Sequence, residues 1–181
     1  MNHLRTTFDK DDAIAITFMY CNYKEQAEQT ISNLVASLLK QMVQNRSAIS
    51  DDVKSFWERH QRQNARPTLD QVADALKSEI ETYSKVFIVV DALDECREDD
   101  ATRAKLLKVL RSLGGNVNLM VTSRDLPSIA RDFEETKSLY IHAKDEDIRI
   151  YLEGRIAVAS RHLKRLQETI VNRIVEKASG M

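Results

Sequence analysis

Acidic residues gather directly after an apolar run in the stretch KVFIVVDALDEC. Apolar residues fill positions 86–90, and Asp91, Asp94 and Glu95 follow in close succession. A buried strand that ends in a carboxylate holds that group rigidly, and such a carboxylate can help to bind Mg²⁺ between nucleotide phosphates. A second acid nearby can polarise a water molecule as a general base. We therefore assign Asp91 as a metal ligand, and Asp94 or Glu95 as the catalytic residue.

A second polar group ends another apolar run, VNLMVTSR. Its last residues are Thr122, Ser123 and Arg124. In a parallel sheet, loops at the carboxyl ends of the strands gather on one rim, where ligands bind. An arginine on that rim can sense the γ-phosphate of a nucleotide as a charge-matched donor. We therefore assign these three residues to cofactor binding, on the same rim as Asp91.

Each assignment has a simpler alternative. Asp91 could cap the following helix, and the run DECREDD could be a solvated loop whose acids favour the positive end of a helix dipole. Arg124 could form an ordinary surface ion pair. Cys96 stands beside acids that disfavour its thiolate, so we do not expect it to act as a nucleophile.

The elements that must position these residues alternate along the chain. Strand-length apolar runs occupy 13–21, 86–90 and 118–122, and a weaker one occupies 138–143. Between them, apolar residues recur with helical spacing. The clearest helical stripe is Ile31, Leu34, Val35, Leu38, Leu39 and Met42. Strands separated by helices predict an α/β fold with a parallel sheet and helices on its faces.

Further helices are indicated by their start signals and stripes. Thr68 with Gln71 has the spacing of a capping box. A helix from Asp51 should turn Val53, Phe56 and Trp57 inward, a helix with Leu106, Leu107, Leu110 and Leu113 should end near Gly114, and Pro127 suits the start of a short helix. From Asp145 onward the pattern is helical only, with the stripes Ile148, Leu152, Ile156 and then Leu163, Leu166, Ile170, Ile174. We expect a core at 1–143 and the start of a helical subdomain at 144–181.

Composition narrows the function classes. The 181 residues are 43% hydrophobic and include 27 basic and 28 acidic residues without a large block of either sign. Nothing therefore indicates a nucleic acid or an anionic membrane as partner. No apolar run reaches bilayer length, and the first residues lack a secretory signal. Two cysteines are too few for a disulfide framework, so we expect a reducing, cytoplasmic location.

The combination of motifs resembles a known family. KVFIVVDALDEC, followed by NLMVTSRDLP, is similar to the Walker B and sensor 1 segments of NACHT-type NTPases, which belong to the signal-transduction ATPases with numerous domains (STAND). Fungal proteins with a nephrocystin-like N-terminal domain are the most similar group. A small residue after the Walker B aspartate and then an acidic pair distinguish the family, and here these are Ala92, Asp94 and Glu95. YCNYKEQAEQTISNLVASLLKQ also resembles the segment after the family's second strand.

The resemblance implies a P-loop NTPase-like three-layer sandwich that works as a nucleotide switch in signalling. Mg²⁺ and ATP or GTP would be the cofactors of the full-length domain, with self-association through that domain as a further option. The alternative is a non-catalytic remnant or a protein-interaction module.

One departure from the family concerns phosphate binding. A P-loop has the form GxxxxGK[ST], and none of the four glycines begins that pattern. Family order puts this Walker A element upstream of NHLRTTF, so we expect the chain to begin after it and to end within the helical subdomain. We then expect the chain alone to bind nucleotide only weakly and not to hydrolyse it.

Two structural expectations follow. The strands should be ordered 13–20, 86–90, 118–122, with the last either exposed at an edge or joined by 139–142. If Asp91, Asp94 and Glu95 lie close together without a bound cation, their mutual repulsion should raise the pKa of at least one of them.

Overall fold

The computed structural model describes residues 2–8, 11–44, 46, 49–98, 100–158 and 165–178. The chain divides into two compact units, 1–132 and 133–181. The elements of the first unit are, in order, α1 (Asn2–Phe8), β1 (Ile14–Tyr20), η1 (Tyr23–Glu25), α2 (Ile31–Gln44), α3 (Asp51–Gln63), α4 (Leu69–Glu81), β2 (Lys85–Asp91), η2 (Leu93–Glu95), α5 (Thr102–Arg111), β3 (Val117–Val121) and α6 (Pro127–Asp132). The division expected from the sequence, a core at 1–143 and a helical subdomain at 144–181, concerns function and stays a prediction.

The described strands form one parallel sheet in the order β1-β2-β3. This confirms the expected order, with β2 in the centre. Tyr20 pairs with Asp91 across β1 and β2, and Val90 pairs with Val121 across β2 and β3. The carboxyl ends of the three strands therefore reach the same rim of the sheet.

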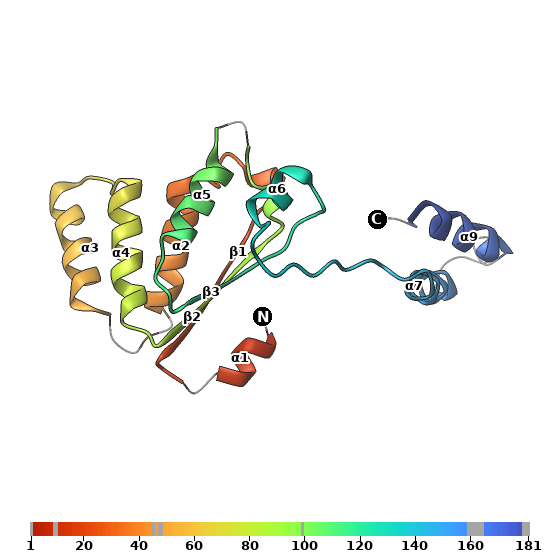
Figure 1. Cartoon of the computed structure of the whole chain (residues 1–181), viewed down its shortest axis with the longest axis horizontal. Helices are drawn as coiled ribbons and strands as arrows, with labels where there is room; N and C mark the ends of the chain where they lie inside the picture. The colour runs from red at the N-terminus through yellow and green to blue at the C-terminus, as the bar shows by residue number, and fades with distance from the viewer. Residues whose placement is uncertain are drawn as a thin grey trace. The chain divides into compact units, whose positions relative to one another are not determined.

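The two faces of the sheet are covered differently. Helices α2, α4 and α5 lie on one side and α1 on the other (Figure 1). On the first side, Val86, Ile88 and Val90 of β2 are fully buried. The expected stripe of α2 is confirmed, because Leu34, Val35, Leu38, Leu39 and Met42 are all buried.

The opposite face has a smaller cover. On α1, the Phe8 ring stacks on the Phe87 ring of β2, with centroids 5.4 Å apart. The Arg5 guanidinium of the same helix lies 5.4 Å from the centre of the Phe18 ring of β1. The architecture is therefore α/β with a parallel sheet and helices on its faces, as the element pattern predicts.

Helix α4 begins as expected, whereas the buried face of α3 differs from the predicted one. Thr68 and Gln71 form the predicted capping box. On α3, Val53 and His60 are buried, but Trp57 is 62% exposed, so the prediction that Trp57 faces inward is wrong. Helix α3 packs mainly on α4, and contact with a single neighbour buries a narrower stripe than the apolar spacing suggests.

The predicted strand at 138–143 is absent. These residues have no strand conformation, and Leu139 and Ile141 are 84% and 83% exposed. A strand persists only when its backbone groups pair with another strand. Apolar alternation predicted a strand, but the described residues provide it with no partner, so that prediction is wrong.

The second unit is helical, as expected. Its described helices are α7 (Asp145–Ala157) and α9 (Gln167–Ala178). They pack through Ile156, Val171 and Val175, with Ile148, Leu152 and Ile170 partly buried. The stripe of the first helix is confirmed.

The stripe predicted for the last helix is only partly right. Leu166 and Ile174 are 46% and 40% exposed, and the valines beside Ile170 and Ile174 are buried instead. Apolar side chains occupy two adjacent faces of this helix, so spacing alone does not identify the packed one. Leu163 lies outside the described residues. None of the helices in the described part of the chain combines the length and apolar character that crossing a bilayer requires.

The two edges of the sheet differ. At the outer edge of β1, the Gln41 side chain accepts a hydrogen bond from Phe18 N at 3.0 Å and donates one to Phe18 O at 2.7 Å. Just beyond, the Gln29 side chain accepts from Asn22 N at 3.0 Å and donates to Tyr20 O at 2.9 Å. These amides replace a neighbouring strand. In the described residues, β3 pairs with β2 alone, so its outer edge is exposed, one of the two expected outcomes.

Replacing Gln41 by alanine should destabilise the first unit. Two backbone groups of Phe18 would lose their partners, and we expect the free energy of unfolding to fall by about 1–2 kcal/mol in urea denaturation. Gln44→Ala, on an exposed position of the same helix, is the matched control and should change it by less than about 0.5 kcal/mol. Equal effects of the two substitutions would show that Gln41 does not cap the edge.

Candidate functional site

The carboxyl ends of β2 and β3 are joined by the side chain of Thr122. Its hydroxyl donates a hydrogen bond to Asp91 Oδ1 and accepts one from Ala92 N at 3.0 Å. The backbone of Thr122 pairs with the same region, because its carbonyl accepts from Leu93 N at 2.9 Å. Asp91 is thus held by the neighbouring strand. The alternative that Asp91 caps a helix is wrong here, since the N-cap of η2 is Ala92, without a side-chain cap.

The chain reverses sharply after Asp91. Ala92 has a φ of 54° and a ψ of 50°, in the left-handed region that glycine adopts readily and that is unfavourable for most other residues. The turn leads directly into η2, which carries Asp94 and Glu95. The turn therefore places a residue in an unfavourable backbone conformation directly between Asp91 and the acids of η2.

Asp94 binds Arg124. Arg124 Nε donates to Asp94 Oδ2 at 2.5 Å, and Arg124 N donates to Asp94 Oδ1 at 3.1 Å. The Asp94 side chain is only 4% exposed, whereas that of Arg124 is 77% exposed. The alternative of an ion pair for Arg124 is thus confirmed, with a buried partner.

This pairing determines the charge state of Asp94. Burial opposes ionisation, but the hydrogen bonds and positive charge of Arg124 outweigh it and lower the pKa of Asp94 below its ordinary value. The same contacts raise the pKa of Arg124. Mutual repulsion among acids that lie together predicts a raised pKa for at least one of the three, whereas the pKa of Asp94 is lowered because Arg124 pairs with it.

Glu95 points toward the segment after β1. Its Oε2 accepts a hydrogen bond from Tyr23 N at 3.2 Å, and its carbonyl accepts one from the Gln26 side chain at 3.1 Å. Ser123 keeps its hydroxyl within its own loop, where it donates to Arg124 O at 2.9 Å. The three predicted acids therefore have three different partners. Within the described ranges, no group of three or more His, Cys, Asp or Glu residues is placed to hold a metal ion.

A buried arginine behind the acidic loop was not among the predicted site residues. Arg103 of α5 is 7% exposed and pairs with Glu98 at 2.5 Å, and it also donates to Ser128 Oγ at 3.3 Å. It neutralises part of the DECREDD run. The run itself is the signal that could have indicated such a cation, because a folded acidic loop needs a counter-charge.

The two cysteines meet beneath this loop. Cys21 and Cys96 are free, buried thiols that share a side-chain hydrogen bond. This bond, together with burial, raises the pKa of Cys21. The same bond lowers the pKa of Cys96 against the effect of burial, with help from the Arg103 charge. The expectation that the Cys96 thiolate is disfavoured is therefore wrong, because Cys21 and Arg103 outweigh the nearby acids.

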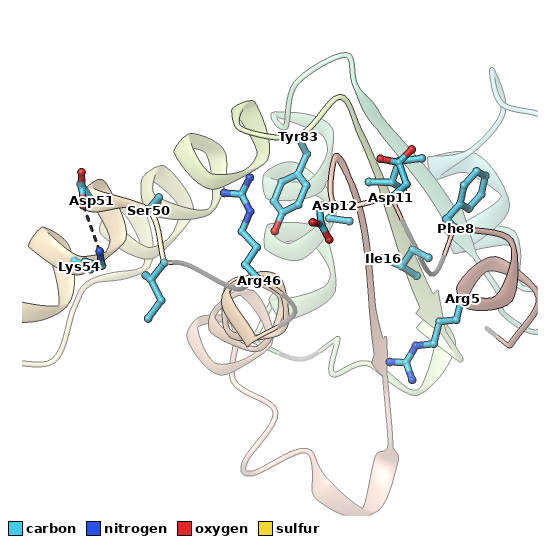
Figure 2. A pocket seen from close by; sticks show the side chains of 13 residues that line it. Arg5, Phe8, Asp11, Asp12, Ile16, Arg46, Ser50, Asp51, Lys54 and Tyr83 are labelled. Atoms are coloured by element: carbon cyan, nitrogen blue, oxygen red, sulfur yellow. Dashed lines mark hydrogen bonds and ion pairs between the residues drawn. The ribbon is translucent and has the colours of Figure 1, made fainter.

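A hollow of about 860 Å³ opens elsewhere, along the amino-terminal half of β1. Figure 2 shows Asp11, Asp12, Arg46 and Tyr83 around it. Arg46 pairs with the buried Glu79 at 3.2 Å and lies over the Tyr83 ring. Asp12 and Tyr83 precede β1 and β2, so the hollow lies toward the opposite end of the strands from Asp91 and contains none of the predicted site residues.

Thr122→Val should separate the two strand ends. It keeps the shape of the side chain but removes the hydroxyl, leaving Ala92 N and Asp91 without that partner, and we expect a loss of about 1–3 kcal/mol in the free energy of unfolding. Thr122→Ser keeps the hydroxyl and should lose less. A valine variant as stable as the serine variant in urea denaturation would contradict the clamp.

Asp94→Asn should change how stability depends on pH. Because the pKa of Asp94 is lowered in the fold, its ionised form stabilises the protein above its ordinary pKa of 3.8, and this contribution is lost as the pH falls through the lower, folded value. The difference in unfolding free energy between wild type and D94N should therefore be largest near neutral pH and shrink in acid. Asp74→Asn, at an exposed position of α4, is the control. A difference that stays constant with pH would exclude the ion pair as its source.

The chain matches a known protein family. Residues 1–124 match the family described as Nephrocystin 3, N-terminal. This range runs from α1 through β1, β2 and β3 to Arg124, so it includes every predicted site residue. No curated protein matches the chain. Since the match covers more than half of the sequence, the chain belongs to the nephrocystin 3 N-terminal family.

Proposed function

We propose that residues 1–124 are part of a nucleotide-binding switch domain of the NACHT type, with a P-loop NTPase-like three-layer fold. The observation that supports this most is the meeting of Asp91 and Thr122 at the carboxyl ends of adjacent parallel strands, with Arg124 on the next loop. In open α/β sheets this rim is where ligands bind. Oxygen ligands from a carboxylate suit Mg²⁺, which usually completes its coordination with water and phosphate oxygens.

The open edge of β3 supports the same proposal. The outer edge of β1 is closed by Gln29 and Gln41, whereas β3 has an unpaired outer side in the described residues. A further parallel strand on β3 would end beside Thr122 and Arg124. A glycine-rich loop after such a strand, at the start of a helix, would hold phosphates next to Asp91. Residues 1–181 contain no GxxxxGK[ST] pattern, so that loop would come from another segment.

The residues on the rim would divide the work as follows. Asp91, held by Thr122, would supply a carboxylate oxygen to Mg²⁺. When bound, the ion neutralises phosphate charge. Glu95 is the better candidate for polarising water, because the lowered pKa of Asp94 makes it a weak base. Asp94 would instead position Arg124 for the γ-phosphate.

The setting follows from the resemblance to signalling proteins of the STAND group. We place the domain in the cytoplasm of a fungal cell, which suits its two free thiols. Self-association through the domain is part of this proposal, and ATP and GTP remain equal candidates. The competing function is a protein-interaction module that binds no nucleotide, and the open edge of β3 is the observation that favours it.

Paramagnetic relaxation can test the rim as a nucleotide site even when affinity is weak. With Mn²⁺ and ATP, or Mn²⁺ and GTP, added to the isotope-labelled chain, we expect amide signals near Asp91 and Thr122 to broaden selectively. Asp91→Asn should remove this effect. Asp125→Asn, which removes an exposed charge on the same rim, is the matched control and should leave it unchanged.

Two outcomes of this experiment would count against the proposal. Broadening without preference for the rim, or equal broadening in D91N, would favour the interaction module. For the 181-residue chain we also expect no measurable hydrolysis and binding weaker than micromolar, because positioning and charge neutralisation by a phosphate loop are missing. Micromolar affinity for Mg-ATP in calorimetry would contradict that second expectation.

A further inference from the structure

The only two cysteines of the chain lie far apart in sequence but meet in the fold. Cys21 follows the last residue of β1, and Cys96 follows η2. Each is 4% exposed, and their thiols share a hydrogen bond. Two thiols in contact, with no third potential metal ligand grouped with them in the described residues, are positioned for chemistry with each other.

Backbone contacts hold each cysteine in place. Cys21 N donates to Asp91 O at 3.0 Å, which extends the pairing of β1 with β2 by one residue. Cys96 N donates to Leu93 O at 3.1 Å and closes the turn of η2. The contacts of Glu95 with Tyr23 N and with the Gln26 side chain then join the two segments directly beside the thiols. The thiol contact is therefore a consequence of the fold, not of two mobile side chains.

We propose that Cys21 and Cys96 are a redox-active pair that forms an intramolecular disulfide when a hydroperoxide oxidises it. One thiolate attacks the peroxide oxygen, the O–O bond breaks, and a sulfenic acid and hydroxide (for hydrogen peroxide) result. The second thiol then attacks the sulfenic sulfur, and the hydroxyl leaves as water. In total, two thiols and one hydrogen peroxide give one disulfide and two water molecules.

The disulfide would connect functionally distinct segments. It would join the segment after β1 to the loop that carries Asp94 and Glu95, and so restrict any movement of that loop. In reducing compartments, disulfides of this kind are usually transient and redox-sensing rather than structural. The pair belongs to the chain itself, so its oxidation does not depend on nucleotide binding.

The competing explanation is that both thiols are simply packed in the core. The two explanations make opposite predictions about folding. If burial only protects the thiols, the native chain should be oxidised more slowly than the unfolded chain. If the fold holds the thiols together for reaction, the native chain should convert the sulfenic acid to the disulfide before it is oxidised further, whereas the unfolded chain must first close a long loop.

The experiment compares oxidation of the full chain by hydrogen peroxide in native buffer and in denaturing urea. Samples are quenched with an alkylating reagent, and peptide mapping by mass spectrometry measures the peptide that links Cys21 to Cys96. We expect the linked peptide to exceed sulfinic acid and intermolecular products by at least about tenfold in the native chain, a larger ratio than in urea, where the resolving thiol must first close the loop. We also expect dithiothreitol to restore both thiols.

Variants that lack one of the two cysteines distinguish disulfide formation by this pair from other oxidation of the chain. Cys21→Ala and Cys96→Ala should each form no intramolecular link, and the remaining cysteine should be oxidised further or form dimers. Native chains whose thiols stay reduced while those of the urea-treated chain react would overturn the proposal. Native oxidation that gives only sulfinic acid or intermolecular disulfides would overturn it as well. Both decisive results come from the wild-type chain, so they stand even if a variant fails to fold.

Discussion

The pairing of β2 with a parallel strand on each side determines most of what this protein can do. Val86, Ile88 and Val90 are fully buried, and a slip of one residue would move them to the other face and bring Lys85 or Asp91 onto the buried one, which fixes the register of β2. That register puts Asp91 opposite Tyr20 and brings Thr122 within hydrogen-bond distance of Asp91. The rim, the thiol pair and the reversal at Ala92 all follow from where these three strands end.

Sequence reasoning succeeds where a pattern reflects one strong local cause. Continuous apolar runs predict β1, β2 and β3, and a single dominant stripe predicts α2. It fails where the outcome depends on a partner that the pattern does not contain. Leu139 and Ile141 alternate like a strand but have no paired edge, and the last helix carries apolar residues on two adjacent faces.

The predictions for the site also succeed or fail according to whether a local cause decides the outcome. The position of Asp91 and Thr122 on one rim could be predicted, because parallel strands place their carboxyl ends together. The ion pair of Asp94 with Arg124 and the burial of Arg103 could not, because each depends on how a loop turns after its strand. Ala92 in the left-handed region directs Asp94 toward Arg124, away from a common cluster with Asp91.

The Asp94 charge is therefore already balanced by Arg124, and this bears on how a phosphate could bind on the rim. Asp94 is nearly buried and holds Arg124 by two contacts, while the guanidinium remains largely exposed. Arg124 has further guanidinium N–H groups that could reach an anion while Nε stays on Asp94, since a guanidinium carries five donors. Binding of this kind would keep the buried carboxylate paired. Moving the Arg124 guanidinium away from Asp94 would instead leave a nearly buried carboxylate without its positive partner, which is unfavourable. A phosphate group on this rim is thus better accommodated by adding to the Asp94–Arg124 pair than by breaking it.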